Sequence, residues 1–184
     1  MFGQEGPALS HLNNQGIKEN DIFLFFGWFK RAEIVDGKFQ YKKNAKDLHV
    51  IYGYLQVGKK YDTYDEIKKN FPWHPHADEY EKDRKLNAVY SATKQLSFLE
   101  EYPGYGTFKF NDKLVLTKEN LSRSRWQLPE CLKDKKITYH SKNSYKDEYF
   151  QSACIGQEFV VVDDIDKKII DWIKGLFESQ KNKS

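Results

Sequence analysis

The segment Trp73-His74-Pro75-His76 holds the residues with the plainest capacity for chemistry. Its prolines forbid regular structure and hold the backbone extended. Side chains at i and i+2 of an extended chain point the same way, so His74 and His76 could reach one metal ion or one phosphate. A metal would need a third ligand, which only an acid or another histidine (His11, His49 or His140) could supply. Two histidines that merely hydrogen-bond to the backbone and stiffen the loop are the alternative, and we predict no metal and no cofactor.

A second candidate site is Ser122-Arg123-Ser124-Arg125-Trp126. Arginine presents a planar fork of donors that suits phosphate, and the hydroxyls of Ser122 and Ser124 could assist. Alternation would send Arg123 and Arg125 to one side, with Trp126 covering the base or sugar of the same ligand. The alternative is a solvated polar segment with one tryptophan buried in the core.

A third candidate is the segment from Phe150 to Phe159. Gln151 and Gln157 carry amides that can both donate and accept, as the reading of a base edge requires. Glu158 could act as a general base if it is buried, together with His140. A turn between two strands would explain the same residues without any ligand.

Several other chemistries have no support in the sequence. There is no P-loop and no GxGxxG motif, and the acids cluster in charged runs, so no catalytic residue can be identified. Cys131 and Cys154 lie far apart without CxxC spacing, which argues against a zinc site or a disulfide framework. No apolar run is long enough to span a bilayer, and no signal peptide is evident. We therefore expect no membrane partner and a cytoplasmic location.

Two apolar strands must position these residues. Ile22–Phe26, followed by Trp28, is almost continuously apolar, and His49–Val57 alternates after Tyr52. Tyr52, Tyr54 and Gln56 would share one face, and Leu55 and Val57 the other. An aromatic and polar face of this kind predicts a small β-barrel that binds something flat.

The remaining elements predict an α+β, β-dominated single domain over residues 1–184, with short helices and a C-terminal helix. Short helices are expected from Pro7 to a stop at Gly16 and from a cap at Thr63 to Asn70, and Asp36-Gly37 should form a hairpin tip. From Asp164 onward a helix is expected from an apolar stripe of period 3.6, made up of Ile165, Ile169, Trp172, Ile173, Leu176 and Phe177. Further strands are expected at 87–92, 107–110, 113–117, 137–140 and 159–162. The aromatic content of 16% favours strands, and a net charge of +3 permits a nucleic-acid partner without requiring one.

Six strings together resemble the third of the nucleotide modification associated domain families. They are Asp21–Phe29, His49–Gly58, Trp73–His76, Leu116–Lys118, Ser122–Trp126 and Gly156–Val160. The resemblance covers nearly the whole chain and implies a role in bacterial or phage systems that handle modified nucleotides in DNA. Members of that family usually carry a further N-terminal segment, which we expect to be missing before Phe2.

A looser pattern of strands, from Asp21 through Gly53-x-Leu55-x-Val57 to Tyr61, is similar to the EVE and ASCH domains of the PUA-like group. That similarity implies a pseudo-barrel that holds a base in an aromatic pocket. We accordingly predict a module of a bacterial or phage DNA-modification system that binds a modified nucleotide or nucleic acid, in an unknown oligomeric state. Its ligand contacts would come from Trp28, Tyr52, Tyr54, Gln56, Trp73, His74, His76, Ser122, Arg123, Arg125, Trp126, His140, Gln157 and Glu158. An enzyme acting on nucleotides through a His/Arg pocket, and an adaptor that binds protein, are the alternatives.

Overall fold

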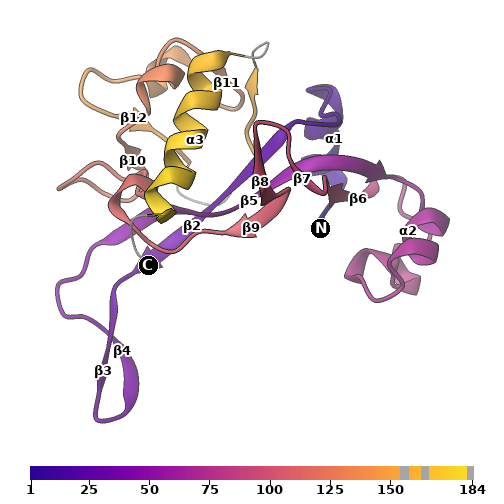
Figure 1. The fold of residues 1–184 in the computed structure, drawn as a ribbon, viewed down its shortest axis with the longest axis horizontal. Coiled ribbons are helices and arrows are strands. Elements are labelled where there is room, and N and C mark those ends of the chain that lie inside the picture. The colour runs from indigo at the N-terminus through magenta and orange to yellow at the C-terminus, as the bar shows by residue number, and fades with distance from the viewer. Residues whose placement is uncertain (154–157, 163–165, 182–184) are drawn as a thin grey trace. The chain divides into compact units, whose positions relative to one another are not determined.

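The computed structural model describes residues 1–153, 158–162 and 166–181. The strands are β1 (Phe2–Glu5), β2 (Ile22–Lys30), β3 (Ala32–Val35), β4 (Lys38–Tyr41), β5 (Asp47–Tyr61), β6 (Asn87–Ala92), β7 (Gln95–Leu96), β8 (Leu99–Pro103), β9 (Tyr105–Thr107), β10 (Arg125–Trp126), β11 (Lys136–Ile137), β12 (Phe150–Gln151) and β13 (Val161–Val162). The α-helices are α1 (Gly6–Asn14), α2 (Tyr64–Asn70) and α3 (Lys167–Lys181) (Figure 1). Short 3-10 turns are η1 (Pro75–Ala77), η2 (Glu79–Glu81), η3 (Asp112–Leu114), η4 (Glu130–Leu132) and η5 (Lys142–Ser144).

The chain divides into two compact units, and each unit is assembled from two separate segments. Unit 1 comprises Met1–Leu24 and Gly53–Thr107, and unit 2 comprises Phe25–Tyr52 and Phe108–Ser184. The long strands β2 and β5 each contribute residues to both units. The main sheet has the strand order β1-β6-β5-β2, and β9 also pairs with β5.

Within unit 1 the sheet curls because β5 changes neighbours along its length. Residues 53–55 of β5 pair with β9, and residues 57–61 pair with β6, with a register shift between Val57 and Lys59. A shift of this kind bends the strand and increases its twist. Gly58 lies at the shift, where an added Cβ would come within 2.7 Å of the Ala92 carbonyl oxygen. The close approach of two backbones thus requires glycine here, and the curl gives the sheet the form of a half-barrel.

The two short helices of unit 1 begin and end as the sequence predicts. Pro7 stands in the first turn of α1, and Gly16 beyond its end adopts a φ of +69°. Thr63 caps α2 by accepting a hydrogen bond from the Glu66 amide at 3.3 Å, the capping-box arrangement. Local sequence signals therefore determine both helices.

Gln56 is the polar centre of unit 1 and is only 1% exposed. Its Nε2 donates to the Asn20 carbonyl at 3.0 Å and to Ser97 Oγ at 2.8 Å. Its Oε1 accepts from the Ser97 amide at 2.8 Å. Because a buried polar atom without a partner is costly, this amide fixes both connecting segments against β5.

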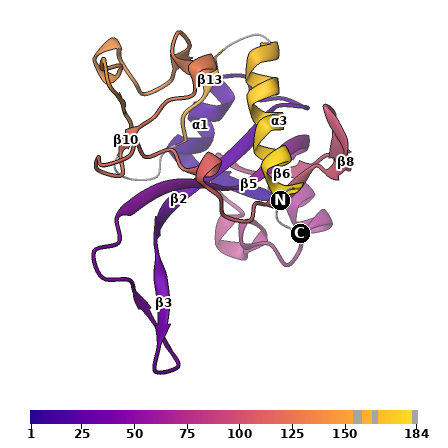
Figure 2. The same cartoon turned by 60° about the vertical axis from the view of Figure 1, so that its left-hand side comes forward.

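Unit 2 contains a two-stranded ribbon formed by β3 and β4. Its turn residues Asp36 and Gly37 have φ values of 50° and 75°, the left-handed pair that a two-residue hairpin demands. Every residue from Arg31 to Lys43 is exposed, and Figure 2 shows the ribbon extending away from the other elements of unit 2. The Asp36-Gly37 hairpin expected from the sequence is confirmed.

The core of unit 2 is aromatic around Trp126, which is 3% exposed. The ring centroid of Phe26 lies 5.1 Å from that of Trp126, and Phe150 and Phe159 complete the cluster at 6.1 and 5.7 Å. Helix α3 adds a second patch, with Ile173, Leu176 and Phe177 all buried. These three belong to the predicted apolar stripe, and Ile165 at its start lies outside the described residues.

The predicted fold class is confirmed: a strand-rich α+β chain with a half-barrel sheet, short helices and a C-terminal helix. Four predicted strands differ. Residues 107–110 contribute only the last residue of β9, and the 3-10 turn η3 at 112–114 overlaps the start of the expected strand 113–117. Of the strands expected at 137–140 and 159–162, only Ile137 and Val161–Val162 belong to strands, in β11 and β13. The side chain of Asn111 accepts a hydrogen bond from the Lys113 amide, and such local bonding competes with strand pairing. Among the described helices none is both long and apolar enough to cross a membrane.

The role of Gln56 gives a stability prediction. Replacing it by Ala leaves the Ser97 amide and the Asn20 carbonyl without their partner, so Gln56→Ala should lower the free energy of unfolding by roughly 2–4 kcal/mol in urea titrations. The exposed Gln95→Ala is the matched control and should stay within about 0.5 kcal/mol. Equal stabilities of the two variants would contradict the assignment of Gln56 to the core.

Candidate functional site

Arg123 and Trp28 form the most conspicuous surface cluster of unit 2. The guanidinium carbon of Arg123 lies 4.0 Å from the centre of the Trp28 ring, a cation–π contact. Trp28 is nevertheless 62% exposed, so much of its indole remains open to solvent. Its Nε1 donates to Asp47 Oδ1 at 3.0 Å, and Lys30 Nζ lies 3.7 Å from the same oxygen. The indole is therefore held in one orientation while its surface stays accessible.

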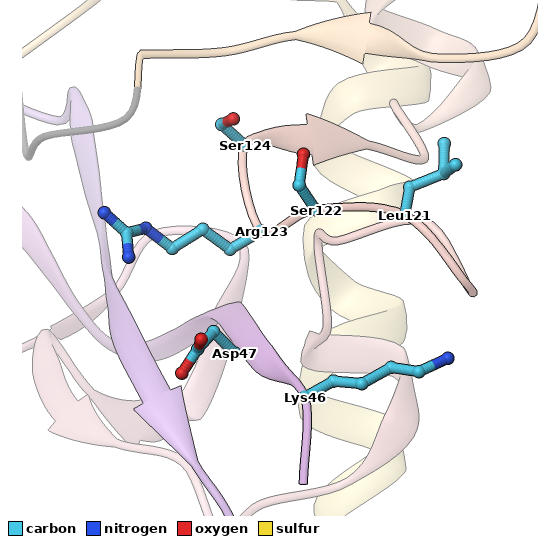
Figure 3. Close-up of a pocket in the computed structure, with 6 residues that line it drawn as sticks. All are labelled: Lys46, Asp47, Leu121, Ser122, Arg123 and Ser124. Atoms are coloured by element: carbon cyan, nitrogen blue, oxygen red, sulfur yellow. The ribbon is translucent and has the colours of Figure 1, made fainter. Parts of the chain in front are cut away.

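An open pocket of about 390 Å³ lies beside this cluster. Figure 3 shows that Arg123 extends to one side of the pocket, and Lys46 to the other. The residues that line this pocket include two cations, two hydroxyls and one acid, a balance that suits an anionic ligand with polar groups. The lining residues are Lys46, Asp47, Leu121, Ser122, Arg123 and Ser124.

A tight loop positions Arg123. Thr117 Oγ1 donates to the Arg123 carbonyl at 2.8 Å and accepts from the His49 amide at 2.8 Å. The loop closes where the Lys118 amide bonds the Arg125 carbonyl at 2.8 Å, and Asn120 supplies a φ of 63° at its tip. Arg123 is thus presented by a closed hairpin loop tied directly to β5.

His49 and Trp126 support that loop from below. Trp126 Nε1 donates to His49 Nδ1 at 3.0 Å, and both side chains are 3% exposed. Burial, and secondly the positive charge of Arg123, lower the pKa of His49. This contact needs a neutral imidazole, because Nδ1 must be unprotonated to accept the hydrogen bond of the indole N–H.

The structure separates the two arginines that the sequence placed together. Arg125 is exposed and lies with its guanidinium carbon 5.0 Å from the centre of the Tyr149 ring, whereas Arg123 lies over Trp28. Trp126, which was expected to cover the base or sugar of the ligand, lies in the core instead. The hairpin loop turns at Ser122, where the Arg125 amide bonds the Ser122 carbonyl at 2.9 Å, and this turn breaks the expected alternation.

The candidates on β5 also differ in environment. Tyr52 is 42% exposed in unit 2, with its ring centre 5.8 Å from that of Phe29. Tyr54 is 5% exposed in unit 1, and its hydroxyl donates to the Pro103 carbonyl at 3.2 Å. Gln56 is buried as described above. Of these three, only Tyr52 presents a large surface.

The histidine segment of unit 1 forms a compact pair. Trp73 is 69% exposed, and His74 and His76 are half-buried with ring centres 5.2 Å apart. His74 Nδ1 accepts from the His76 amide at 3.1 Å, and His76 Nδ1 bonds Asn87 Oδ1. Burial, then His76 and the N-terminal charge, lower the pKa of His74. These contacts fit both interpretations of the segment: histidines that stiffen the loop by hydrogen bonding, and histidines that bind a ligand.

Two further candidates lie in unit 2. His140 packs with its ring centre 4.8 Å from Phe150 and 5.1 Å from Phe159, and its Nδ1 lies 2.9 Å from the Thr138 carbonyl. Glu158 is half-buried, and Gln157 lies outside the described residues. His140 is therefore held by core aromatics and by backbone.

Sequence reasoning missed Lys46, Asp47 and the exposed ribbon residues. Phe39 is 82% exposed and Tyr41 71% exposed, both on β4. The alternation Lys38-Phe39-Gln40-Tyr41 between lysines was a signal that could have indicated an aromatic, basic strand. Nothing in the sequence brings Asp47 to Trp28, because that contact spans 19 positions.

Comparison with known proteins gives one match. The model of the nucleotide modification associated domain 3 family matches residues 1–162, which include every candidate residue described above. No curated protein and no solved structure matches the chain. The resemblance expected from the six sequence strings is confirmed.

The lowered pKa of His49 predicts a pH dependence of stability. The ordinary pKa of histidine is 6.5, and that of folded His49 is lower. As the pH falls through 6.5, His49 therefore binds a proton in the unfolded state before it does in the folded state, and the free energy of unfolding decreases. His49→Gln retains an acceptor for Trp126 but cannot titrate. The variant should therefore show a flatter loss of unfolding free energy between about pH 7.5 and 5.5 than the parent protein. Denaturant titrations followed by tryptophan fluorescence would measure both slopes, and identical slopes would contradict the prediction.

Proposed function

We propose that this chain, which belongs to the nucleotide modification associated domain 3 family, is a nucleic-acid-binding module whose ligand contacts Trp28 and Arg123. The observation that carries the proposal is the open indole of Trp28, held by Asp47 and covered in part by the Arg123 guanidinium. Such a pair offers a stacking surface on Trp28 next to a phosphate-binding fork on Arg123, which lines the adjacent pocket.

The chemistry of each group supports a nucleotide rather than a simple anion. A base stacked on Trp28 would contribute about 1–3 kcal/mol, whatever its identity or modification. Arg123 and Lys46 would bind phosphate, with Ser122 as an additional donor. Asp47 repels phosphate, but its carboxylate can accept from a ribose hydroxyl or a base amino group. The pocket therefore has a basic part for the backbone and an acidic part for a base or sugar.

The β3–β4 ribbon favours a polymer over a free mononucleotide. Between Lys30 and Lys46 the basic residues outnumber the acidic ones by six to two. Phe39, Tyr41 and Ile34 on the ribbon are all at least 64% exposed. A two-stranded ribbon fits the major groove of duplex DNA, and exposed rings can stack on unpaired bases. The ribbon would thus extend contact along a strand whose nucleotide occupies the pocket.

Substitutions in the pocket test the stacking and charge contributions. Trp28→Ala and Arg123→Ala should each weaken oligonucleotide binding at least about tenfold, because each removes a contact worth about 1–3 kcal/mol. Arg123→Lys should rescue only part of the loss, since lysine lacks the planar fork. Fluorescence anisotropy with single- and double-stranded oligonucleotides would measure the affinities.

Two variants in unit 1 provide matched controls for that experiment. Tyr105→Ala removes an aromatic ring whose 59% exposure is close to that of Trp28, and Lys69→Ala removes one positive charge from an exposed helix position. Both should bind within about twofold of the parent protein, the precision expected of sites that make no contact. A parent protein that binds no oligonucleotide, or controls that lose as much affinity as the pocket variants, would overturn the proposal.

The ribbon is tested separately through the salt dependence of binding. Each phosphate neutralised on duplex DNA adds about 0.9 to the slope of log K against log salt. The double variant Lys42→Ala/Lys43→Ala should therefore lower that slope by up to roughly 2 between 50 and 200 mM salt. The exposed pair Lys167→Ala/Lys168→Ala at the start of α3 removes the same charge and should leave the slope unchanged. Equal slopes for both double variants would exclude the ribbon from the interface.

A further inference from the structure

We infer that unit 1 contains a binding site for one divalent metal ion, formed by Glu5, His76 and Glu81. One ligand atom from each of these residues lies within 4.8 Å of the others. Glu5 comes from the end of β1, and His76 and Glu81 come from the consecutive turns η1 and η2, so the ion would join two segments that are distant in sequence. The site is independent of the pocket in unit 2.

Asn87 orients the imidazole of His76 for metal binding. Asn87 is 3% exposed, and its Nδ2 donates to the His76 carbonyl at 3.0 Å. Its Oδ1 consequently faces His76 Nδ1 and accepts a hydrogen bond from the N–H of that nitrogen. The lone pair is then on Nε2, and a second nitrogen hydrogen-bonded in this way is characteristic of metal-ligating histidines.

The strand β1 lies directly against the two histidines. A Cβ at Gly3 would come within 2.6 Å of His76 Nε2 and 2.8 Å of His74 Cε1, so only glycine fits there. Glu5, two residues further on β1, pairs in register with Asn87. His74 Nδ1 accepts a hydrogen bond from the His76 amide, so the proton of its neutral ring is on Nε2 and neither nitrogen has a free lone pair. We therefore assign the role of metal ligand to His76.

Glu81 is a buried carboxylate within this cluster. Its side chain is 4% exposed, and Arg84 Nε forms an ion pair with its Oε2 at 3.1 Å, while that oxygen has no further hydrogen-bond donor among the described residues. Two carboxylates in contact favour a cation between them, because its positive charge offsets their mutual repulsion.

Arg84 is the competitor for this position. Its Nη1 lies 2.8 Å from Glu5 Oε2, so one guanidinium bridges both carboxylates. Arg84 is exposed and follows the exposed residues Lys82 and Asp83, so its side chain is not enclosed by the core. The guanidinium carries one positive charge, whereas the carboxylates of Glu5 and Glu81 carry two negative charges. A divalent ion matches both negative charges and also accepts the lone pair of His76 Nε2.

The donor set indicates which ions would bind. Imidazole suits zinc and iron, and carboxylates suit manganese and magnesium, so one histidine with two carboxylates favours Zn²⁺ or Mn²⁺ over Mg²⁺. Water would complete the coordination. Such an ion would link β1 to the η1–η2 segment of unit 1 and raise the thermal stability of the protein.

Calorimetric titration of the EDTA-treated, full-length protein with Zn²⁺ and Mn²⁺ tests the inference. We expect one ion per chain, with a rise in Tm of roughly 5–10 °C at 100 times Kd. His76→Ala and Glu81→Gln should each weaken binding at least tenfold, and Asn87→Ala about tenfold as a positioning residue. Arg84→Met should bind several-fold more tightly, because the competing cation is gone. His11→Ala and Glu79→Gln in the same unit are the matched controls and should bind as the parent does.

The inference is overturned if neither the parent nor Arg84→Met binds one ion, or if His76→Ala and Glu81→Gln bind as tightly as the controls. A readout that needs no variant covers the case in which a substitution prevents folding. Mn²⁺ should broaden the amide NMR signals of Gly3, Glu5, His76 and Glu81 before any others. Broadening confined to other residues would place the ion elsewhere and would equally contradict the site.

Discussion

The buried hydrogen bond from the Trp126 indole to the His49 imidazole is the contact on which the proposed ligand surface depends. It joins β10 to β5 at the centre of the aromatic core of unit 2, and Thr117 bonds both the His49 amide and the Arg123 carbonyl. A neutral His49 is required, and the nearby Arg123 charge helps to keep it neutral. The core and the surface are therefore coupled, because the cation that would bind phosphate also maintains the hydrogen bond beneath it.

Both units use side-chain amides to secure their connections, buried ones in unit 1 and a half-buried one in unit 2. In unit 1, Gln56 satisfies the Asn20 and Ser97 backbone groups, and Asn87 holds the His76 backbone and ring. In unit 2, Gln151 Nε2 reaches Ser124 Oγ at 3.2 Å behind the pocket. Amides with both donors and acceptors serve equally well for reading a base edge or for joining two backbone segments. Residue type alone does not distinguish these uses.

Ion pairs already present at both proposed sites compete with the ligand or metal ion that each site would bind. Asp47 is neutralised by Lys30 and bonded to Trp28, and the Glu5–Glu81 pair is bridged by Arg84. A ligand must displace or share these contacts, so its affinity reflects a difference between two sets of charge interactions. The Lys30–Asp47 pair is partly exposed and contributes little to stability, so a change of partner there costs little free energy. Glu81 is buried, so a cation that displaces Arg84 must also replace its positive charge.

The sequence by itself determined the local elements and the family of this protein. Pro7 with Gly16, Thr63 with Glu66, and Asp36-Gly37 each act through bonds within a few residues, so the two helices and the hairpin could be predicted from order alone. Only the tertiary structure decided which polar and aromatic side chains face solvent. Trp28 and Trp126 are both tryptophans beside candidate motifs, yet one is 62% exposed and the other 3%, because burial depends on neighbours far away in the chain. Likewise, no spacing predicts that Glu5 meets Glu81 or that Trp28 meets Asp47, since strand pairing and loop closure bring those groups together.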